Sequence, residues 1–516
     1  MWWVAHKEEC SGRPDLLATR QTSRRRHDFY LGLFMEQRKS YNDEKGKTQV
    51  GQTPIRLNTD ALYDGGLSRS SDETSVMGAE RRAEVVQLEL DLPTLGNQRK
   101  SNFHSTKGIP ITKQMVWSAY NKVRSNGGSA GIDNQKLTDY EVNMKRNLYK
   151  LWNRLSSGSY FPVAVKEVSI PKTPAQRRKL GIPTVNDRIA QEVIKSYIEP
   201  ELDKEFSPHS YGYRPLKSSH QAVTQVKKNV LQYEWVIDMD ISSFFDNMSH
   251  EKVIKALSRH VKDNWVIMYV ERWLTAPMQD KHGKNTMRHK GTPQGGVISP
   301  LLANLFLHYT FDKWFVQNYP DLSFVRYADD IVVHCHSEAE SRGVLQAIKE
   351  RMSVCELMLN EEKTNIVYCK TANRKLPFKT VKFDFLGFSF QPRPATNSRT
   401  NKLFLSFDCA ISKKKESTIL QEIRQSKFHQ WTDRTLADIA ETFNPKLRGW
   451  LNYYGKFRPY KLNKIFGAFN WRLIKWAVKK YKSFKGSMRK AGDWIRATAK
   501  NYPYIFVHWQ HGFQGA

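Results

Sequence analysis

Two adjacent carboxylates, Asp329 and Asp330, stand between apolar runs in the stretch 324–335 (FVRYADDIVVHC). Apolar, β-branched runs around a short polar turn predict a β-hairpin. Neighbouring anions at the tip of a hairpin repel each other unless a cation neutralises them. A hard divalent ion with a preference for oxygen, such as Mg²⁺, would do so. On its own, however, an Asp-Asp turn is more often a solvated acidic turn than a metal site.

A third carboxylate, Asp240, closes the apolar run 235–240 (WVIDMD), which predicts a short buried strand. Sites in α/β structures tend to lie at the carboxyl ends of strands. Two carboxylates on a hairpin and one on a neighbouring strand can hold two divalent ions about 4 Å apart, an arrangement suited to in-line phosphoryl transfer. We assign Ile241, the next residue, to the same site. Phe245 lies where a ring could wall off the sugar of an incoming nucleotide.

A glycine-rich loop, 291–298 (GTPQGGVI), lies between these two stretches. It lets the backbone approach a substrate and offers Gln294 as a hydrogen-bonding amide. Ser299 and Pro300 after it predict a helix start, with Ser299 as the N-cap and Pro300 as the first helical residue. Alone the loop is a weak signal, but in order with the two carboxylate stretches it becomes a strong one.

Taken in order, these stretches resemble a bacterial group II intron-encoded reverse transcriptase/maturase, of a lineage that lacks a C-terminal HNH endonuclease. The resemblance covers about four-fifths of the chain, and YADD alone would indicate only a reverse transcriptase. The motifs that carry it are IPTVNDRIAQ (182–191), SYGYRP (210–215), DISSFFD (240–246), TPQGGVISPLLANLFL (292–307), RYADD (326–330), LNEEKTNIVYC (359–369), FDFLGFSF (383–390) and NPKLRGWLNYYGKF (444–457).

The resemblance implies an α+β fold: a right-hand polymerase with fingers, a palm built on a split-βαβ sheet and a helical thumb, followed by a mostly helical maturase domain. The expected divisions are a flexible extension (1–100), an insertion with the fingers (101–235), the palm (236–390), the thumb (391–440) and the maturase domain (441–516).

The activity implied is RNA-directed DNA synthesis that copies intron RNA into DNA during retrohoming, together with help for intron splicing. The partners implied are group II intron RNA, an RNA template with a DNA primer, dNTPs and a DNA target site. Two Mg²⁺ ions, with Mn²⁺ as a substitute, would be held by Asp240, Ile241, Asp329 and Asp330.

Other cations receive roles from the same resemblance. Lys172 and Arg178 are spaced like the pair that holds an incoming triphosphate, although Arg177 is a rival for the second position. Lys363, in the LNEEKT stretch, could protonate the departing pyrophosphate. Solvated loop charges are the alternative reading for each of them.

Three further residues are candidates for RNA contact. Arg214 either contacts a phosphate or braces its own loop, and the two readings are evenly balanced. Arg448 and Lys456 flank the maturase signature and are the expected RNA contacts there.

Composition also points to a polyanionic partner. The 516-residue chain has a net charge of +31, and residues 391–516 alone hold 25 Lys and Arg against 7 Asp and Glu. Such a surplus predicts nucleic-acid binding that weakens with salt. The five cysteines form no CxxC pair, and no apolar run is long enough to span a membrane. We therefore expect a cytoplasmic protein without a membrane partner.

Two other functions stay open from the sequence. One is an RNA-binding splicing cofactor without polymerase activity, which the presence of all three carboxylates disfavours. The other is a domesticated reverse transcriptase that serves repair or phage defence, whose chemistry would be the same. The extension 1–100 is either a solvated tail or an RNA-gripping arm, and a short helix is predicted at 80–92.

Overall fold

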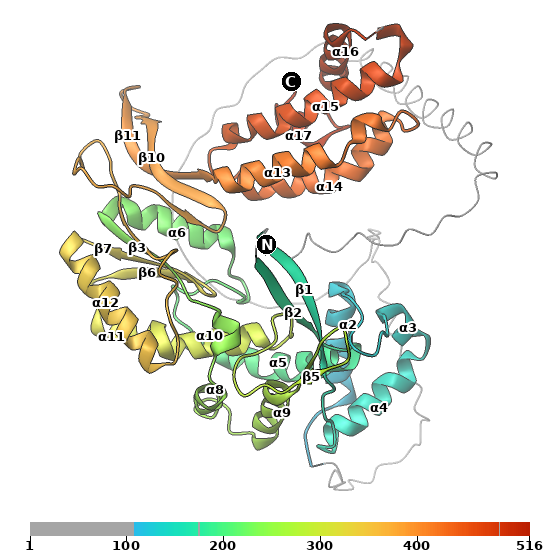
Figure 1. Ribbon diagram of the computed structural model, residues 1–516, viewed down its shortest axis with the longest axis vertical. Helices are drawn as coiled ribbons and strands as arrows, with labels where there is room; N and C mark the ends of the chain where they lie inside the picture. The colour runs from blue at the N-terminus through green and yellow to red at the C-terminus, as the bar shows by residue number, and fades with distance from the viewer. Residues whose placement is uncertain (1–107, 174–175, 485, 516) are drawn as a thin grey trace, which may run out of the picture. The chain divides into compact units, whose positions relative to one another are not determined.

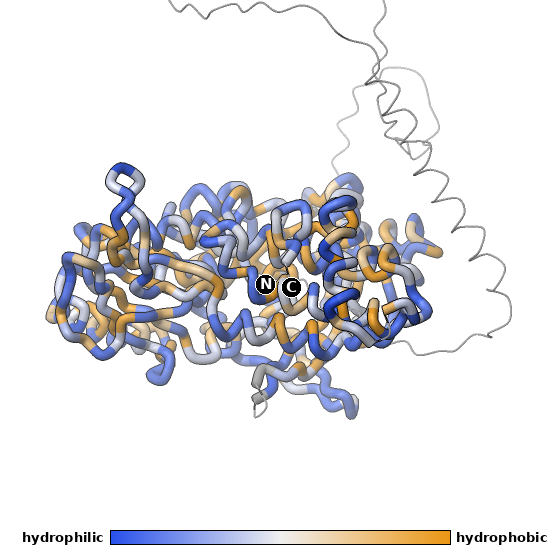
Figure 2. The backbone as a smooth tube through the Cα atoms, turned by 90° about the horizontal axis from the view of Figure 1, so that it is seen from above, coloured by the Kyte–Doolittle hydropathy of each residue, from blue (hydrophilic) through white to orange (hydrophobic). Residues whose placement is uncertain are grey.

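The computed structural model describes residues 108–173, 176–484 and 486–515 (Figure 1). The predicted flexible extension and the helix predicted at 80–92 lie outside this part of the chain. No helix within it combines the length and the apolar character that crossing a membrane requires. Along the tube in Figure 2, apolar and polar stretches alternate at short intervals.

The first described elements are helices followed by a hairpin. Helix α2 begins after Thr112, whose hydroxyl accepts a hydrogen bond from the Met115 amide. The strands β1 and β2 pair in antiparallel fashion within a sheet of order β2-β1-β4-β5. The elements are α2 (Lys113–Asn126), α3 (Leu137–Val142), α4 (Met144–Ser156), β1 (Val165–Thr173), β2 (Gln176–Ile182), α5 (Val185–Glu205), β4 (Met278–Gln279) and β5 (Asn285–Thr286).

The palm sheet has the order β6-β7-β3-β8, and every neighbouring pair in it is antiparallel. Figure 1 shows α6 on one side of this sheet and α11 and α12 on the other. The elements are α6 (Ser219–Gln232), β3 (Trp235–Asp240), α7 (Phe244–Asn247), α8 (His250–Leu257), α9 (Asn264–Thr275), α10 (Ser299–Leu307), the π-helix η2 (His308–Asp312), α11 (Lys313–Asn318), β6 (Ser323–Tyr327), β7 (Asp330–Cys335), α12 (Glu338–Val354) and β8 (Asn365–Tyr368).

Successive side chains of the palm strands point alternately into two hydrophobic cores. On β3, Ile237 and Met239 join the core that also contains buried residues of α8 to α12. Val236 points to the opposite face and joins a second core. This period of two is the ordinary consequence of strand geometry, and it places Asp240 on the same face as Val236.

The second core continues from the palm into the C-terminal helices, where Trp476 and Trp509 are fully buried. The elements are β9 (Phe383–Phe385), β10 (Phe388–Thr396), β11 (Leu403–Ile411), α13 (Lys413–Gln425), η3 (Phe428–Gln430), α14 (Leu436–Tyr454), η4 (Pro459–Leu462), α15 (Asn463–Lys480), η5 (Lys482–Phe484), α16 (Met488–Asn501) and α17 (Val507–Gln510). A mixed sheet region followed by helices confirms the predicted α+β class.

One helix start differs from the prediction. Helix α10 begins at Ser299 itself, and its N-cap is Ile298. The Ser299 hydroxyl does not cap the helix, because it forms a 2.8 Å hydrogen bond with the hydroxyl of Thr292 in the glycine-rich loop. Ser299 therefore fastens the loop to the helix.

Candidate active site

The structure brings together the three carboxylates singled out in the sequence. Asp240 is the last residue of β3, and its partner across the antiparallel pair is Asp330, the first residue of β7. Residues directly opposite each other in such a pair share a face, with Cβ atoms roughly 5 Å apart. Asp329 lies in the turn that joins β6 to β7. All three therefore lie at one end of the palm sheet.

Crowding of these acids changes their proton affinities. The pKa of Asp330 is raised to about 7 by desolvation and by the negative charges of Asp329 and Asp240. The pKa of Asp329 is also raised, first by burial. Asp238, one step back on the same face of β3, has a pKa raised well above its usual value by burial and by neighbouring carboxylates. The sequence analysis missed Asp238, although the D-x-D spacing of a strand placed it on this face.

A lysine already neutralises part of this charge. The Asn360 amide donates to the Asp240 carbonyl oxygen (2.8 Å), so the turn after residue 359 lies beside the end of β3. This turn carries Lys363, whose ammonium group forms an ion pair with the Asp240 carboxylate.

The donor chemistry fits a hard divalent ion, because carboxylate oxygens are the ligands that Mg²⁺ prefers. As the side chains stand, however, no group of three or more His, Cys, Asp or Glu residues in the described part of the chain is arranged to hold a metal ion.

Arg177 and Arg178 have different surroundings. The Arg177 guanidinium donates to the hydroxyl of Ser169 (3.0 Å) and to its carbonyl oxygen (2.8 Å), so it is held against β1. Arg178 lies within electrostatic reach of Asp329 and lowers the pKa of that carboxyl against the effect of burial. The side chain of Lys172 lies outside the described part of the structure. Of the two arginines, Arg178 is the one that faces the carboxylates.

The glycine-rich loop joins α7 to the β1–β2 hairpin. The Thr292 amide donates to the Phe245 carbonyl (2.7 Å), and the Gly181 amide of β2 donates to the Gln294 carbonyl (2.9 Å). Gly291 has a φ of 79°, and a Cβ there would collide with the Phe245 carbonyl oxygen. The Ile241 side chain is buried in the first core, so only its backbone can face the carboxylates.

The turn that presents Asp329 and Asp330 packs closely against the SYGYRP stretch. Ala328 has a φ of 56°, a left-handed conformation that is unfavourable for residues with a Cβ. Gly212, from the SYGYRP stretch, lies so close that a Cβ there would collide with the Ala328 nitrogen. The Asn304 amide of α10 donates to the Gly212 carbonyl (2.7 Å).

A buried ion pair, also missed from the sequence, anchors the same turn. Arg326 makes two hydrogen bonds to the Asp312 carboxylate (2.8 and 2.6 Å), and both side chains are fully buried. Another nitrogen of Arg326 donates to the Asn304 side chain (2.9 Å) and to the Ala328 carbonyl (3.3 Å). Two features of the sequence could have indicated this buried pair. One is an arginine within an apolar strand, and the other is the two polar residues Asn304 and Asp312, eight positions apart in an apolar helical stretch.

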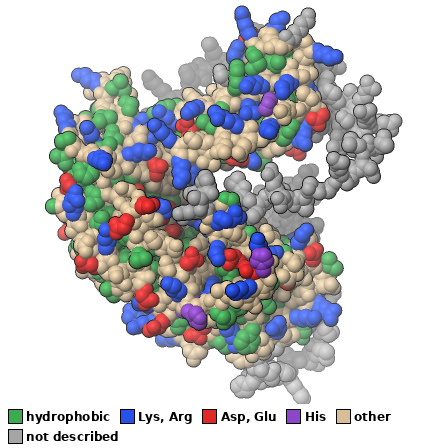
Figure 3. All heavy atoms as spheres, in the orientation of Figure 1, with side chains coloured by type: hydrophobic (Ala, Val, Ile, Leu, Met, Phe, Trp, Pro, Cys, Tyr) green, Lys and Arg blue, Asp and Glu red, His purple; other side chains and the backbone are tan. Residues whose placement is uncertain are grey.

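The three predicted RNA contacts are placed differently from one another. Arg214 is a brace, because its donors bind the Asp203 carboxylate (2.6 Å) and the carbonyls of residues 203, 207 and 210. Its guanidinium is thus bonded inside the protein, which favours the bracing reading over the phosphate contact. Arg448 and Lys456 are exposed. In Figure 3, Lys and Arg side chains are spread over the region that corresponds to α13–α16 in Figure 1.

A palm sheet with three carboxylates at one end, faced by an arginine from a fingers hairpin, defines the class of template-dependent nucleic-acid polymerases. Comparison with known families identifies which kind of polymerase the chain is. Residues 170–390 match the family model described as reverse transcriptase (RNA-dependent DNA polymerase). Residues 417–492 match the maturase-specific domain of group II introns.

The relatives agree with this assignment. The chain is 32% identical over 300 residues to Protein YkfC of Escherichia coli, covering 50% of this chain and 74% of the relative. It is 25% identical over 439 residues to the group II intron-encoded protein LtrA of Lactococcus lactis, covering 67% of this chain and 69% of LtrA. It is also 25% identical over 446 residues to a putative COX1/OXI3 intron 1 protein of Saccharomyces cerevisiae, covering 72% of this chain and 53% of that protein.

The chain belongs to the family of group II intron-type reverse transcriptases with a maturase domain. It is an RNA-directed DNA polymerase with a maturase role. Reverse transcriptases of this kind generally use divalent metal ions. Among solved structures, the chain overlaps weakly with a telomerase from Candida albicans (TM-score 0.39, 11% identity, 73% of this chain and 68% of that one).

Proposed function

We propose that Asp240, Asp329 and Asp330 hold two Mg²⁺ ions, with Mn²⁺ as a substitute, and that DNA synthesis takes place at this end of the palm sheet. The observation that carries the proposal is the pairing of Asp240 with Asp330 beside the turn that presents Asp329. The backbone of Ile241, next to Asp240, contributes to the same site.

When bound, the two ions would activate the primer 3′-hydroxyl and stabilise the leaving pyrophosphate. Residues of the chain position the substrate and supply a proton for this reaction. Asp240 exchanges its ion pair with Lys363 for a place in the site, which frees the Lys363 ammonium to give a proton to the pyrophosphate. Arg178, with Lys172, holds the triphosphate by charge-assisted hydrogen bonds. Phe245, whose carbonyl accepts from the glycine-rich loop, and Gln294 of that loop flank the incoming nucleotide.

The substrate proposed is group II intron RNA, copied into DNA from a DNA primer at a target site during retrohoming. The exposed Arg448 and Lys456 contact RNA from the maturase domain. The bacterial origin stays a prediction from the resemblance. The described cysteines are all free and buried, which supports the reducing environment of the cytoplasm.

Primer extension on an RNA template tests the catalytic assignment. Asp329→Ala should lower the rate of dNTP incorporation by about 10³-fold, because an electrostatic group at the reacting phosphate is lost. RNA affinity should stay within about twofold of the parent, since one carboxylate adds little to phosphate binding. The control is Asp433→Ala, which removes an exposed carboxylate elsewhere. Undiminished synthesis by the Asp329 variant would remove the assignment.

A further inference from the structure

The stretch 182–191 (IPTVNDRIAQ), which leads into α5, has no part in the proposed chemistry, yet several of its polar side chains are buried. Asp187, Arg188 and Gln191 are 2%, 8% and 3% exposed. Buried polar groups are normally paired, because burial without a hydrogen-bond partner is costly. The partners of these three side chains therefore show what the stretch holds in place.

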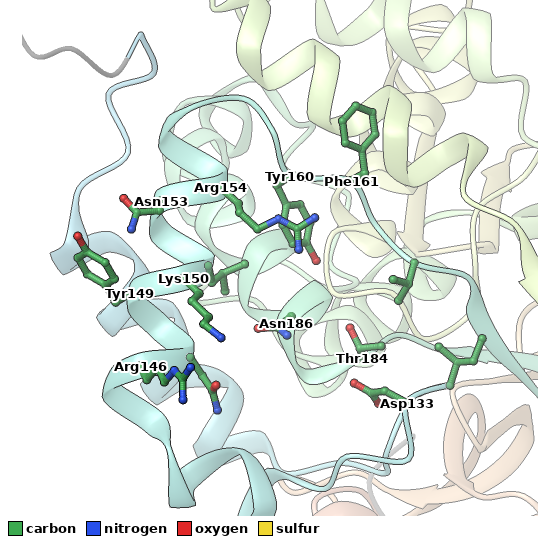
Figure 4. A pocket seen from close by; sticks show the side chains of 14 residues that line it. Asp133, Arg146, Tyr149, Lys150, Asn153, Arg154, Tyr160, Phe161, Thr184 and Asn186 are labelled. Atoms are coloured by element: carbon green, nitrogen blue, oxygen red, sulfur yellow. The ribbon is translucent and has the colours of Figure 1, made fainter.

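The first turn of α5 is firmly anchored. The Asp187 carboxylate accepts hydrogen bonds from the hydroxyls of Tyr160 (2.6 Å) and Thr184 (2.9 Å). The Thr184 hydroxyl also accepts from the Asp187 amide and so caps the helix. The Arg188 guanidinium donates to the carbonyls of residues 127 and 129 (2.9 and 3.0 Å). Figure 4 shows this end of the helix from the side of a neighbouring pocket, with Thr184 and Tyr160 labelled. A helix bonded in this way is a fixed support for the side chains that follow.

One turn further along α5, Gln191 reaches the glycine-rich loop. Its side-chain oxygen accepts from the Val297 amide (2.8 Å) and from the Ile298 amide (3.3 Å), which follow it by 106 and 107 positions in the chain. These amides end the loop just before α10 begins at Ser299. An amide oxygen has two lone pairs and can satisfy both donors. Gln191 thus fastens the end of the loop to α5.

The loop is packed tightly around this contact. A Cβ at Gly296 would collide with the Ser299 hydroxyl and would lie 3.3 Å from Gln191 Oε1. Gly295 has a φ of 127°, and a Cβ there would collide with the Gly181 carbonyl oxygen. Neither position has room for a side chain, so the loop lies in close contact with the groups that hold it.

Gln294 lies between the two fixed ends of the loop. At one end the Thr292 amide is bonded to the Phe245 carbonyl, and at the other Gln191 holds the amides of residues 297 and 298. Gln294 is half-buried and Gly295 after it is exposed, so this is a part of the loop that a substrate can reach. The place of the Gln294 side chain therefore depends on Gln191.

We propose that Gln191 is a positioning residue for DNA synthesis, which holds the glycine-rich loop so that Gln294 meets the incoming nucleotide. Gln191 acts through the loop and not on the substrate, since its own side chain is buried. The inference rests on the proposed function in that Gln294 flanks the nucleotide.

Single-nucleotide incorporation on an RNA template with a DNA primer tests this role. Gln191→Met keeps the length of the side chain and removes its acceptor, so the KM for dNTP should rise about tenfold while kcat changes less than about threefold. Gln191→Glu keeps an oxygen that can accept from both amides, and its KM should lie within about threefold of the parent's.

The control is Tyr269→Phe, which removes a different buried hydrogen bond, from the Tyr269 hydroxyl to the Leu155 carbonyl (2.7 Å). This variant should lower the melting temperature without changing the KM for dNTP. A rise in KM as large as that of Gln191→Met would show that any loss of buried bonding has the same effect, and would overturn the proposal.

A double variant tests whether Gln191 acts through Gln294. Gln294→Ala should raise the KM for dNTP, and Gln191→Met/Gln294→Ala should raise it no further, because the two residues contribute to one effect. An unchanged KM in Gln191→Met, or two effects that add, would contradict the proposed positioning.

Amide hydrogen exchange measures the contact without catalysis. Exchange at residues 297 and 298 should be at least about tenfold faster in Gln191→Met than in the parent, because the acceptor of both amides is lost. Exchange as slow as in the parent would also overturn the proposal. Asp329→Ala should keep the slow exchange of the parent, so a failure of the catalytic assignment would be seen separately.

Discussion

At the scale of single residues, two neighbouring arginines of β2 are expected to differ in function. Arg177 is bound to Ser169 through two hydrogen bonds, whereas Arg178 lies within electrostatic reach of Asp329. We expect Arg178→Ala to raise the KM for dNTP by about ten- to a hundredfold, since a charge-assisted contact to the triphosphate is lost. Arg177→Ala should change it less than about twofold. Single-nucleotide incorporation measures both, and the reverse ranking would transfer the role to Arg177.

The ion pair between Lys363 and Asp240 leads to a second prediction at this scale. A cation that neutralises Asp240 competes with Mg²⁺ for the same carboxylate. Lys363→Met should therefore lower the Mg²⁺ concentration that gives half-maximal primer extension, by about fivefold. The maximal rate should fall at the same time, because the proposed proton donor is removed. A Mg²⁺ titration separates the two effects. A higher Mg²⁺ requirement would show that Lys363 supports the site without competing for it.

At the scale of elements, the pair of Arg326 and Asp312 ties η2 to the strand that leads into the catalytic turn. Removing one partner of a fully buried pair leaves an uncompensated charge, which costs about 3–5 kcal/mol. We expect Arg326→Met to lower the free energy of unfolding by this amount in urea denaturation.

The double variant Arg326→Met/Asp312→Leu distinguishes stability from positioning. Replacing both charges by apolar side chains is often neutral for stability, so most of the lost free energy should return. Activity should stay low, because the contact from Arg326 to the Ala328 carbonyl is still absent. Full recovery of primer extension would mean that Arg326 has no part in holding the turn.

The elements also show what the sequence could predict. Period-two apolar runs predicted β3 and the β6–β7 hairpin, since alternate residues face opposite cores. Ordered motifs then placed the carboxylates on neighbouring strands. The role of Arg326 was not predictable in the same way, because a charge within an apolar strand reveals burial but not its partner. Ser299 was misassigned for a related reason: its preference as a cap was outweighed by a hydrogen bond to Thr292, which depends on the tertiary fold.

At the scale of the whole molecule, one hydrophobic core joins the palm to the maturase region. Val236 and Val332 of the palm belong to the same core as Phe388 and the buried face of α14. The His220 ring nitrogen, on α6, lies 2.8 Å from the Tyr453 carbonyl of α14. The face of the palm that carries Asp240 is thus covered in part by elements after residue 383. Polymerase and maturase regions are therefore expected to unfold together.

If the two regions unfold together, a buried titratable group in the maturase region affects the stability of both, and His508 is such a group. His508 is fully buried, and its Nε2 lies 2.8 Å from the Asn470 side-chain oxygen, to which it donates in the neutral state. Burial lowers the pKa of His508 to about 3. The unfolded chain binds a proton at this residue near pH 6.5, whereas the folded chain does not. Stability due to His508 is therefore complete above pH 6.5 and is lost as the pH falls from there toward 3.

Comparison with His508→Gln isolates this contribution from other titrating groups. The stability advantage of the parent over the variant should shrink by about 1.4 kcal/mol for each pH unit below 6.5. Asp187→Asn provides a control of opposite sign. Burial raises the pKa of Asp187 to about 6, so the parent loses stability as the pH rises from about 3.9 to 6. Urea unfolding followed by tryptophan fluorescence at pH 5, 6 and 7.5 measures both differences. Slopes of the same sign in the two variants would contradict the assignment, because burial disfavours the protonated histidine but favours the protonated carboxyl.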